Sequence, residues 1–116
     1  MLEYPSLNRT ALVVNPLKPY WDWANNIKDG IPIGEKQYTL TEMDTTVYLI
    51  PDLDPALVQK HIEEIFLEIF EDELNAWWIK EEDWPKERTY EVFKKWFEVR
   101  IAPLVYDTSD GDLTKE

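Results

Sequence analysis

The sequence has no cysteine, one histidine, two serines and three glycines. Without cysteine there is no disulfide, no thiolate nucleophile and no cysteine-ligated metal site. His61 alone cannot supply the histidine pairs of zinc-protease motifs or of di-iron carboxylate proteins. Neither Ser6 nor Ser109 lies in a G-x-S-x-G motif, and the glycines form no phosphate-binding loop. We therefore expect no cofactor, and no motif in the chain predicts catalysis.

Long apolar runs are also absent. No segment approaches the roughly 18 consecutive apolar residues that indicate a membrane-spanning helix. The first residues show no basic segment followed by an apolar run, which is the pattern of a signal peptide. We expect a cytoplasmic protein that does not associate with membranes.

Basic residues are scarce relative to acidic ones. Twelve lysines and arginines face 24 aspartates and glutamates, so the net charge is -12. A chain of this charge is on average repelled by phosphate backbones, which disfavours direct nucleic-acid binding. A basic protein remains a suitable partner. The alternative interpretation is that the excess acid only keeps the protein soluble.

Apolar and aromatic residues, in contrast, are abundant. Of the 116 residues 44% are hydrophobic and 14% aromatic, and six are tryptophan. This content is enough for one buried core in a chain of this length. We expect a single globular domain over residues 1–116, with a frayed polar tail at 108–116.

The apolar patterns predict an α+β fold, in which a small sheet of three or four strands is packed by three helices in the order β-α-β-α-β-α-β. The predicted strands are 9–16, 45–50, 76–79 and 104–107. The predicted helices run from 19 to before 29, from 55 to near 72–74, and from 90 to before 103. Residues 29–44 read as an irregular connection with room for one helical turn at 41–44.

The second helix carries the clearest pattern. Asp54-Pro55 is a favourable helix start, and an apolar stripe at spacings of three and four follows from Val58 to Phe70. Glu73 falls on the apolar side of this stripe and Leu74 off it, so we expect the helix to end or bend there. The third helix is predicted from the Thr89 cap and from apolar residues at 90, 93, 96, 97 and 101.

The strongest candidate for a binding surface is the acidic segment 63–83. It holds nine acids and one base, Lys80, and so accounts for -8 of the net charge. Docking on a basic partner, as an adaptor or inhibitor does, would use such a surface, whereas a merely solvated face is the alternative. The residues predicted to bind the partner are Glu64, Glu68, Glu71, Asp72, Glu81, Glu82 and Asp83.

A second hypothesis is a small-molecule-binding protein or enzyme. Trp21 lies off the apolar face of its helix, next to Asp22. Arg100 falls on the aromatic face of the predicted third helix, where a guanidinium must pair, stack or bind an anion. A ligand pocket near Trp21, Asp22 and Arg100 would use all three. The alternative is that Trp21 is core and that Arg100 reaches water along its stem.

Several stretches resemble a family of short, acidic, uncharacterised bacterial proteins. They are Arg9-Thr10-Ala11-Leu12-Val13-Val14, Lys18-Pro19-Tyr20 with Trp23, Val47-Tyr48-Leu49-Ile50-Pro51, Trp84-Pro85 and Phe93-Lys94-Lys95-Trp96-Phe97. The resemblance implies a bacterial cytoplasmic protein. It implies no activity, and no functional residue carries over from it.

Overall fold

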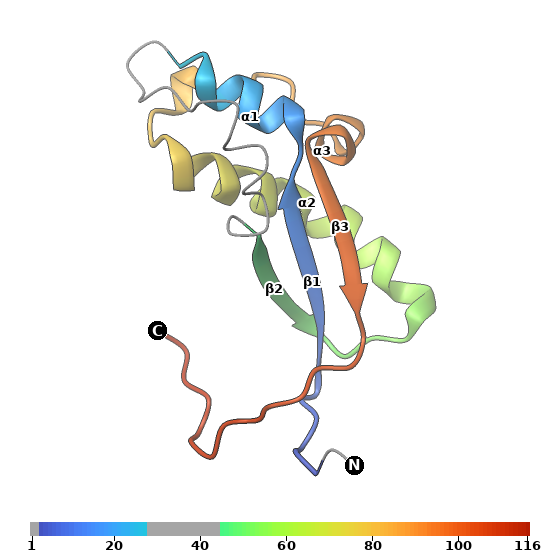
Figure 1. Cartoon of the computed structure of the whole chain (residues 1–116). Helices are drawn as coiled ribbons and strands as arrows, with labels where there is room; N and C mark the ends of the chain where they lie inside the picture. The colour runs from blue at the N-terminus through green and yellow to red at the C-terminus, as the bar shows by residue number, and fades with distance from the viewer. Residues whose placement is uncertain (1–2, 28–44) are drawn as a thin grey trace.

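The sheet is built around strand β1 (Arg9–Pro16) in the computed structural model of the chain, which describes residues 3–27 and 45–116. β1 pairs antiparallel with β2 (Thr46–Pro51) on one side and with β3 (Phe97–Ala102) on the other (Figure 1). The apolar, β-branched run in β1 suits this central position, because a central strand is flanked by neighbours on both edges. Within the described residues, three antiparallel strands in the order β2-β1-β3 therefore form the sheet.

The helices gather on one face of the sheet and at one of its ends. They are α1 (Lys18–Asn25), α2 (Pro55–Trp77), α3 (Tyr90–Trp96) and the 3₁₀ helix η2 (Glu81–Asp83). α2 crosses the sheet, while α1 and α3 lie at the end where β1 finishes and β3 begins (Figure 1). There the Leu17 amide donates to the Trp96 carbonyl at 2.8 Å. The prediction of an α+β fold is confirmed, and the part of the chain that the structure describes holds three α-helices, as predicted.

Aromatic rings fill the centre of the core. The ring centroid of Phe70 lies 5.9 Å from that of Phe93 and 5.4 Å from that of Phe97, and the last two are 5.3 Å apart. All three side chains are fully buried. They join α2, α3 and β3, and burying each contributes roughly 1.5–3 kcal/mol to stability.

The predicted end of α2 near 72–74 is wrong, because the helix continues to Trp77. Glu73 and Leu74 are both buried, since α1 packs on this half of α2. The Tyr20 hydroxyl donates to the Glu73 carbonyl at 2.8 Å, and the rings of Trp21 and Trp77 lie 6.3 Å apart. Packing by α1 therefore buries more of the circumference of α2 than the apolar stripe from Val58 to Phe70 indicates. The strand predicted at 76–79 is also wrong, because its first two residues belong to α2.

The prediction that one helix runs from Tyr90 to before Pro103 is wrong as well. α3 ends at Trp96, and the chain enters β3 at Phe97. From Phe97 to Ile101 apolar and polar residues alternate, in the sequence Phe97-Glu98-Val99-Arg100-Ile101. Alternation with a period of two residues is typical of a β-strand. β1 offers this segment a ladder of backbone hydrogen bonds, and β-branched residues favour it.

The fourth strand predicted at 104–107 is not a strand. Its residues pair with the N-terminal segment through an isolated bridge between Ser6 and Tyr106, and the Leu7 amide donates to the Val105 carbonyl at 2.7 Å. Pro103, which lacks an N–H group, separates this segment from β3. The four-stranded sheet and the strict β-α alternation are therefore not supported. The connection predicted at 29–44, with its helical turn, lies outside the described residues.

Candidate functional site

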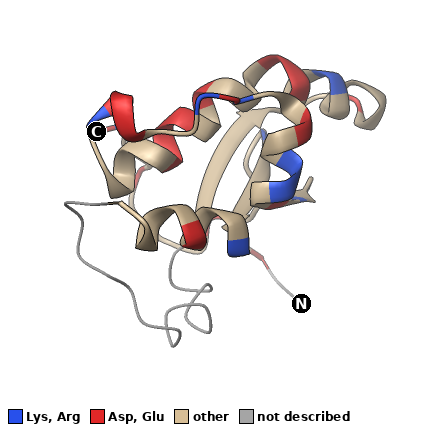
Figure 2. Cartoon of the chain, turned by 90° about the horizontal axis from the view of Figure 1, so that it is seen from above, with Lys and Arg blue, Asp and Glu red and all other residues tan. Residues whose placement is uncertain are grey.

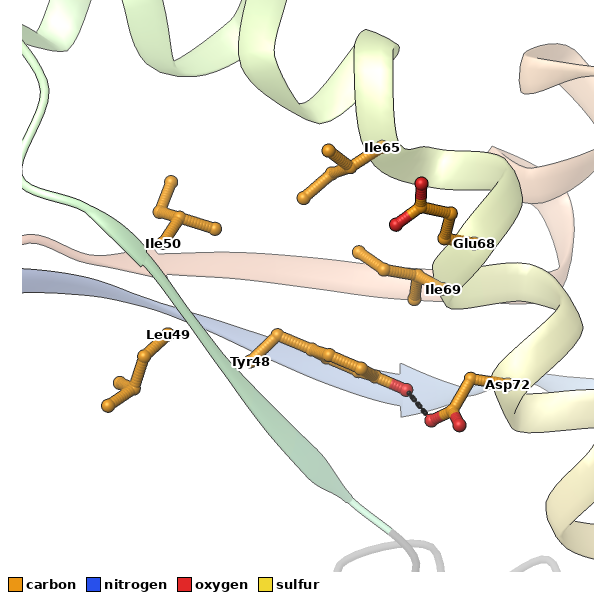
Figure 3. Close-up of a pocket in the computed structure, with 7 residues that line it drawn as sticks. All are labelled: Tyr48, Leu49, Ile50, Ile65, Glu68, Ile69 and Asp72. Atoms are coloured by element: carbon orange, nitrogen blue, oxygen red, sulfur yellow. Dashed lines mark hydrogen bonds between the residues drawn. The ribbon is translucent and has the colours of Figure 1, made fainter. Parts of the chain in front are cut away.

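An apolar groove with acidic residues on its rim lies between β2 and α2 (Figure 3). We call it the β2–α2 groove. Its volume is about 360 Å³. Ile50 and Ile69 are its most buried walls, each 3% exposed. The residues that line the groove are Tyr48, Leu49, Ile50, Ile65, Glu68, Ile69 and Asp72.

Helical and strand periods explain why these residues meet. Ile65, Glu68, Ile69 and Asp72 are three or four positions apart, so they share one side of α2. On β2, Tyr48 and Ile50 point toward the helix because side chains alternate along a strand. Leu49 points away from the helix (Figure 3). The groove is therefore apolar at its base and acidic along α2.

Tyr48 links the two walls of the groove. Its hydroxyl lies 2.7 Å from Oδ2 of Asp72 and 3.2 Å from Oε1 of the buried Glu73, and it donates to Asp72 in the shorter contact (Figure 3). Burial, the hydrogen bond to Asp72 and the charge of Glu73 all raise the pKa of Tyr48 well above its ordinary value. The phenol therefore stays protonated near neutral pH. It acts as a hydrogen-bond donor, and it is unsuited to be a base or a nucleophile.

Some acids of the predicted surface on α2 have an ion-pair or hydrogen-bond partner, and others have none among the described residues. Glu71 forms an ion pair with Arg88 at 3.3 Å, and Asp72 accepts from Tyr48. Glu64 and Glu68 are exposed, and among the described residues neither has a basic side chain within salt-bridge distance. Glu68 lines the groove, and Glu64 lies one helical turn before it on α2.

The remaining predicted acids lie beyond the end of α2, in η2, and Figure 2 shows acidic residues along both elements. Glu81 and Glu82 are exposed. Asp83 has a structural role, because its Oδ2 accepts from the Trp78 indole at 2.9 Å and its backbone carbonyl accepts from the Trp23 indole at 2.9 Å. Asp83 therefore fastens η2 to α1, and its carboxylate is already in use.

The structure does not bring Trp21, Asp22 and Arg100 together. Trp21 is 4% exposed and packs against Trp77, while Asp22 pairs with Lys18 at 2.9 Å. Arg100 lies on β3 rather than on a helix, and its side chain is 76% exposed and hydrogen-bonded to Glu98.

The strand conformation of residues 97–102 explains where Arg100 points. Arg100 is opposite Val13 in the register, whereas the neighbouring pair Val14 and Val99 packs into the core under the helices. Because strand neighbours point to opposite faces, Arg100 faces away from the helices that cover Trp21. The sheet therefore separates the guanidinium from the indole.

The described residues hold no cluster of three acidic or histidine side chains able to bind a metal ion. Within the same ranges, no helix combines the length and apolar character needed to cross a membrane. No protein-family model, curated protein or solved structure matches the chain. The resemblance to a bacterial family accordingly stays a prediction.

Sequence reasoning identified the acids of the site but missed the groove. Tyr48 belongs to a correctly predicted strand, yet its role depends on which face of β2 meets α2. The strand gives no signal of its inner face, since Val47, Tyr48, Leu49 and Ile50 are all apolar or aromatic and do not alternate with polar residues. The pairing of that strand with the helix is a tertiary contact that no local pattern encodes.

Proposed function

We propose that this chain is a non-catalytic protein-binding module, an adaptor or an inhibitor, that presents the acidic side of α2 to a basic partner. The observation that carries the proposal is the exposed pair Glu64 and Glu68, which has no basic partner among the described residues. Like charges at this spacing cost a helix roughly 0.2–0.5 kcal/mol. A basic partner would replace that repulsion with attraction.

The β2–α2 groove supports the same proposal. Protein interfaces combine an apolar centre with a polar rim. Ile65 is partly exposed beside the carboxylate of Glu68, so one partner segment can bury apolar groups and satisfy a charge at once. Glu81 and Glu82 add negative charge beyond the end of α2, which favours the approach of a basic protein over a longer range.

The net charge also argues against nucleic acids and anionic membranes as partners. A chain of charge -12 repels phosphate backbones and anionic lipid surfaces. We therefore propose basic proteins rather than nucleic acids as partners, and the cytoplasm as the location, in keeping with a chain free of cysteine.

Charge reversal tests the proposal. Proteins captured from the source cells by the wild-type chain are compared with those captured by a Glu64→Lys/Glu68→Lys variant. Glu71 is left unchanged because its loss would break the ion pair with Arg88. We expect the specific partners to fall at least about tenfold in the variant, since opposed charges become like charges.

The matched control is a Glu87→Lys/Asp110→Lys variant. Both residues are exposed acids outside α2, and the change in net charge is the same. We expect this control to retain the wild-type partners. Partner sets that are the same for the wild type and the α2 variant would refute the proposed function.

A further inference from the structure

β2 is an edge strand without charge. Among the described strands only β1 pairs with it, so alternate N–H and C=O groups of β2 point away from the sheet without a partner strand in that part of the chain. β2 reads Thr-Val-Tyr-Leu-Ile-Pro, whereas the opposite edge, β3, carries Glu98 and Arg100. Charged residues are a common protection of exposed edges against pairing. β2 is therefore the edge more open to an added strand.

A strand added to β2 would meet two different surfaces. It would lie about 4.8 Å from β2, and its side chains would alternate between the two faces of the sheet. On the helix side they would enter the β2–α2 groove, over Ile65 and beside Glu68. On the other side they would lie beside Val47 and Leu49, which are 55% and 49% exposed.

These two surfaces require different side chains. Long basic side chains suit the helix side, because their alkyl stems cover isoleucine while their charged ends reach Glu64 and Glu68. Apolar side chains suit the outer side, where they form cross-strand pairs with Val47 and Leu49. A partner segment that satisfies both faces has basic and apolar residues in alternation.

We propose that the partner is held as an extended segment of alternating basic and apolar residues, which adds to the free edge of β2 as a fourth, outer strand. This inference rests on the proposed function and specifies the chemistry of its partner. Strand addition supplies affinity through backbone hydrogen bonds and specificity through alternate side chains. Here the specificity resides in the acids of α2 and in the apolar residues Val47 and Leu49.

A second copy of the chain fits the edge less well. Two copies joined through β2 would bring two molecules of charge -12 together. β2 contains no lysine or arginine that could approach Glu64 or Glu68 of the other copy. Charge complementarity therefore favours a basic segment from another protein.

The test uses a synthetic peptide of alternating lysine and valine, with its binding followed by fluorescence anisotropy. Two modified peptides carry N-methyl groups on every lysine amide or on every valine amide. Because amide direction also alternates along a strand, one set of N–H groups faces β2 and the other faces solvent. We expect one modified peptide to bind at least about tenfold more weakly and the other to change less than about threefold.

Two protein variants locate the binding edge. Leu49→Lys places a charge on β2, and Ile101→Lys places one on the opposite edge strand at matched exposure, 49% against 47%. Circular dichroism and thermal unfolding confirm that both variants fold. We expect Leu49→Lys to weaken peptide binding about tenfold and Ile101→Lys to leave it unchanged.

Each outcome bears on one of the two proposals. Equal effects of the two N-methylated peptides, or no binding of the parent peptide, overturn strand addition. If binding still depends on Glu64 and Glu68 while the methylated peptides behave alike, the proposed function stands and only the binding mode fails. A dimer of the free chain that Leu49→Lys dissociates would also overturn the inference, since a second copy would then occupy the edge.

Discussion

At the scale of single residues, the hydroxyl group of Tyr48 connects β2 to α2. It lies between the carboxylates of Asp72 and Glu73, and one of them, Glu73, is buried. A buried polar group that loses its partner costs about 1–3 kcal/mol. The hydroxyl group therefore contributes to the stability of the contact between β2 and α2.

Replacing Tyr48 with Phe should destabilise the protein by about 1–3 kcal/mol at neutral pH, because both carboxylates lose their contact with the hydroxyl. The difference should shrink at alkaline pH. The pKa of Tyr48 is raised in the folded state above its ordinary value of 10.0. Its contribution to stability is complete below that pH and declines above it, as the unfolded chain loses the phenolic proton first.

Urea unfolding of both proteins at about pH 8 and about pH 11 measures this effect. The other titrating groups are common to both proteins, so their contributions largely cancel in the comparison. The free energy of unfolding should fall more steeply with pH in the wild type than in the variant. Parallel pH profiles would show that the raised pKa of Tyr48 is not linked to folding.

A second residue-scale prediction concerns Asp83. Its carboxylate accepts from the Trp78 indole, so Asp83→Ala should cost about 0.5–1.5 kcal/mol. Asp83→Asn keeps an oxygen acceptor without the charge, and it should cost less. Thermal unfolding of the two variants distinguishes a hydrogen-bond role from a charge role. Equal losses would mean that the charge, rather than the acceptor, is what matters.

At the scale of elements, a segment that follows only the helical or only the strand spacing of apolar residues was predicted correctly. A segment where one spacing changes into the other was not. The strand at 9–16 and the start of the helix at Pro55 were predicted because a single pattern covers each of them. Phe97 satisfies both the helical stripe from Phe93 and the alternation that continues to Ile101. Only pairing with β1 decides between the two, and that pairing is a long-range contact.

The short helix α3 offers an element-scale prediction. It has seven residues, so its start depends on the cap formed by Thr89, whose hydroxyl accepts from the Val92 amide at 3.2 Å. Thr89→Ala should destabilise the protein by about 1 kcal/mol, and Thr89→Ser should restore most of the loss. Chemical unfolding measures both. A serine variant as unstable as the alanine variant would argue against the cap.

At the scale of the whole molecule, composition predicted the fold class but not the site. The apolar patterns were sufficient to predict an α+β domain with the three α-helices of the described residues, but the predicted order β-α-β-α-β-α-β was wrong after α2. The acidic segment appeared uniform in the sequence, yet Arg88 pairs with Glu71 from another part of the chain. Such partners are set by tertiary packing, and they decide which acids remain available.

The net charge of -12 leads to a prediction about salt. Screening should weaken repulsion within the folded chain, so the unfolding temperature should rise between about 20 mM and about 500 mM sodium chloride. The Glu64→Lys/Glu68→Lys variant should show a smaller rise. Binding of the lysine–valine peptide should weaken over the same range. Stability and binding that respond to salt in the same direction would contradict this charge assignment.

The most direct test of the central claim is to map where a basic segment binds. Amide NMR spectra of the ¹⁵N-labelled chain are recorded while the lysine–valine peptide is added. We expect the largest shifts in β2 and in the part of α2 from Glu64 to Asp72, and we expect the Glu64→Lys/Glu68→Lys variant to lose them. Shifts centred on η2 or on β3, or no shifts at all, would contradict it.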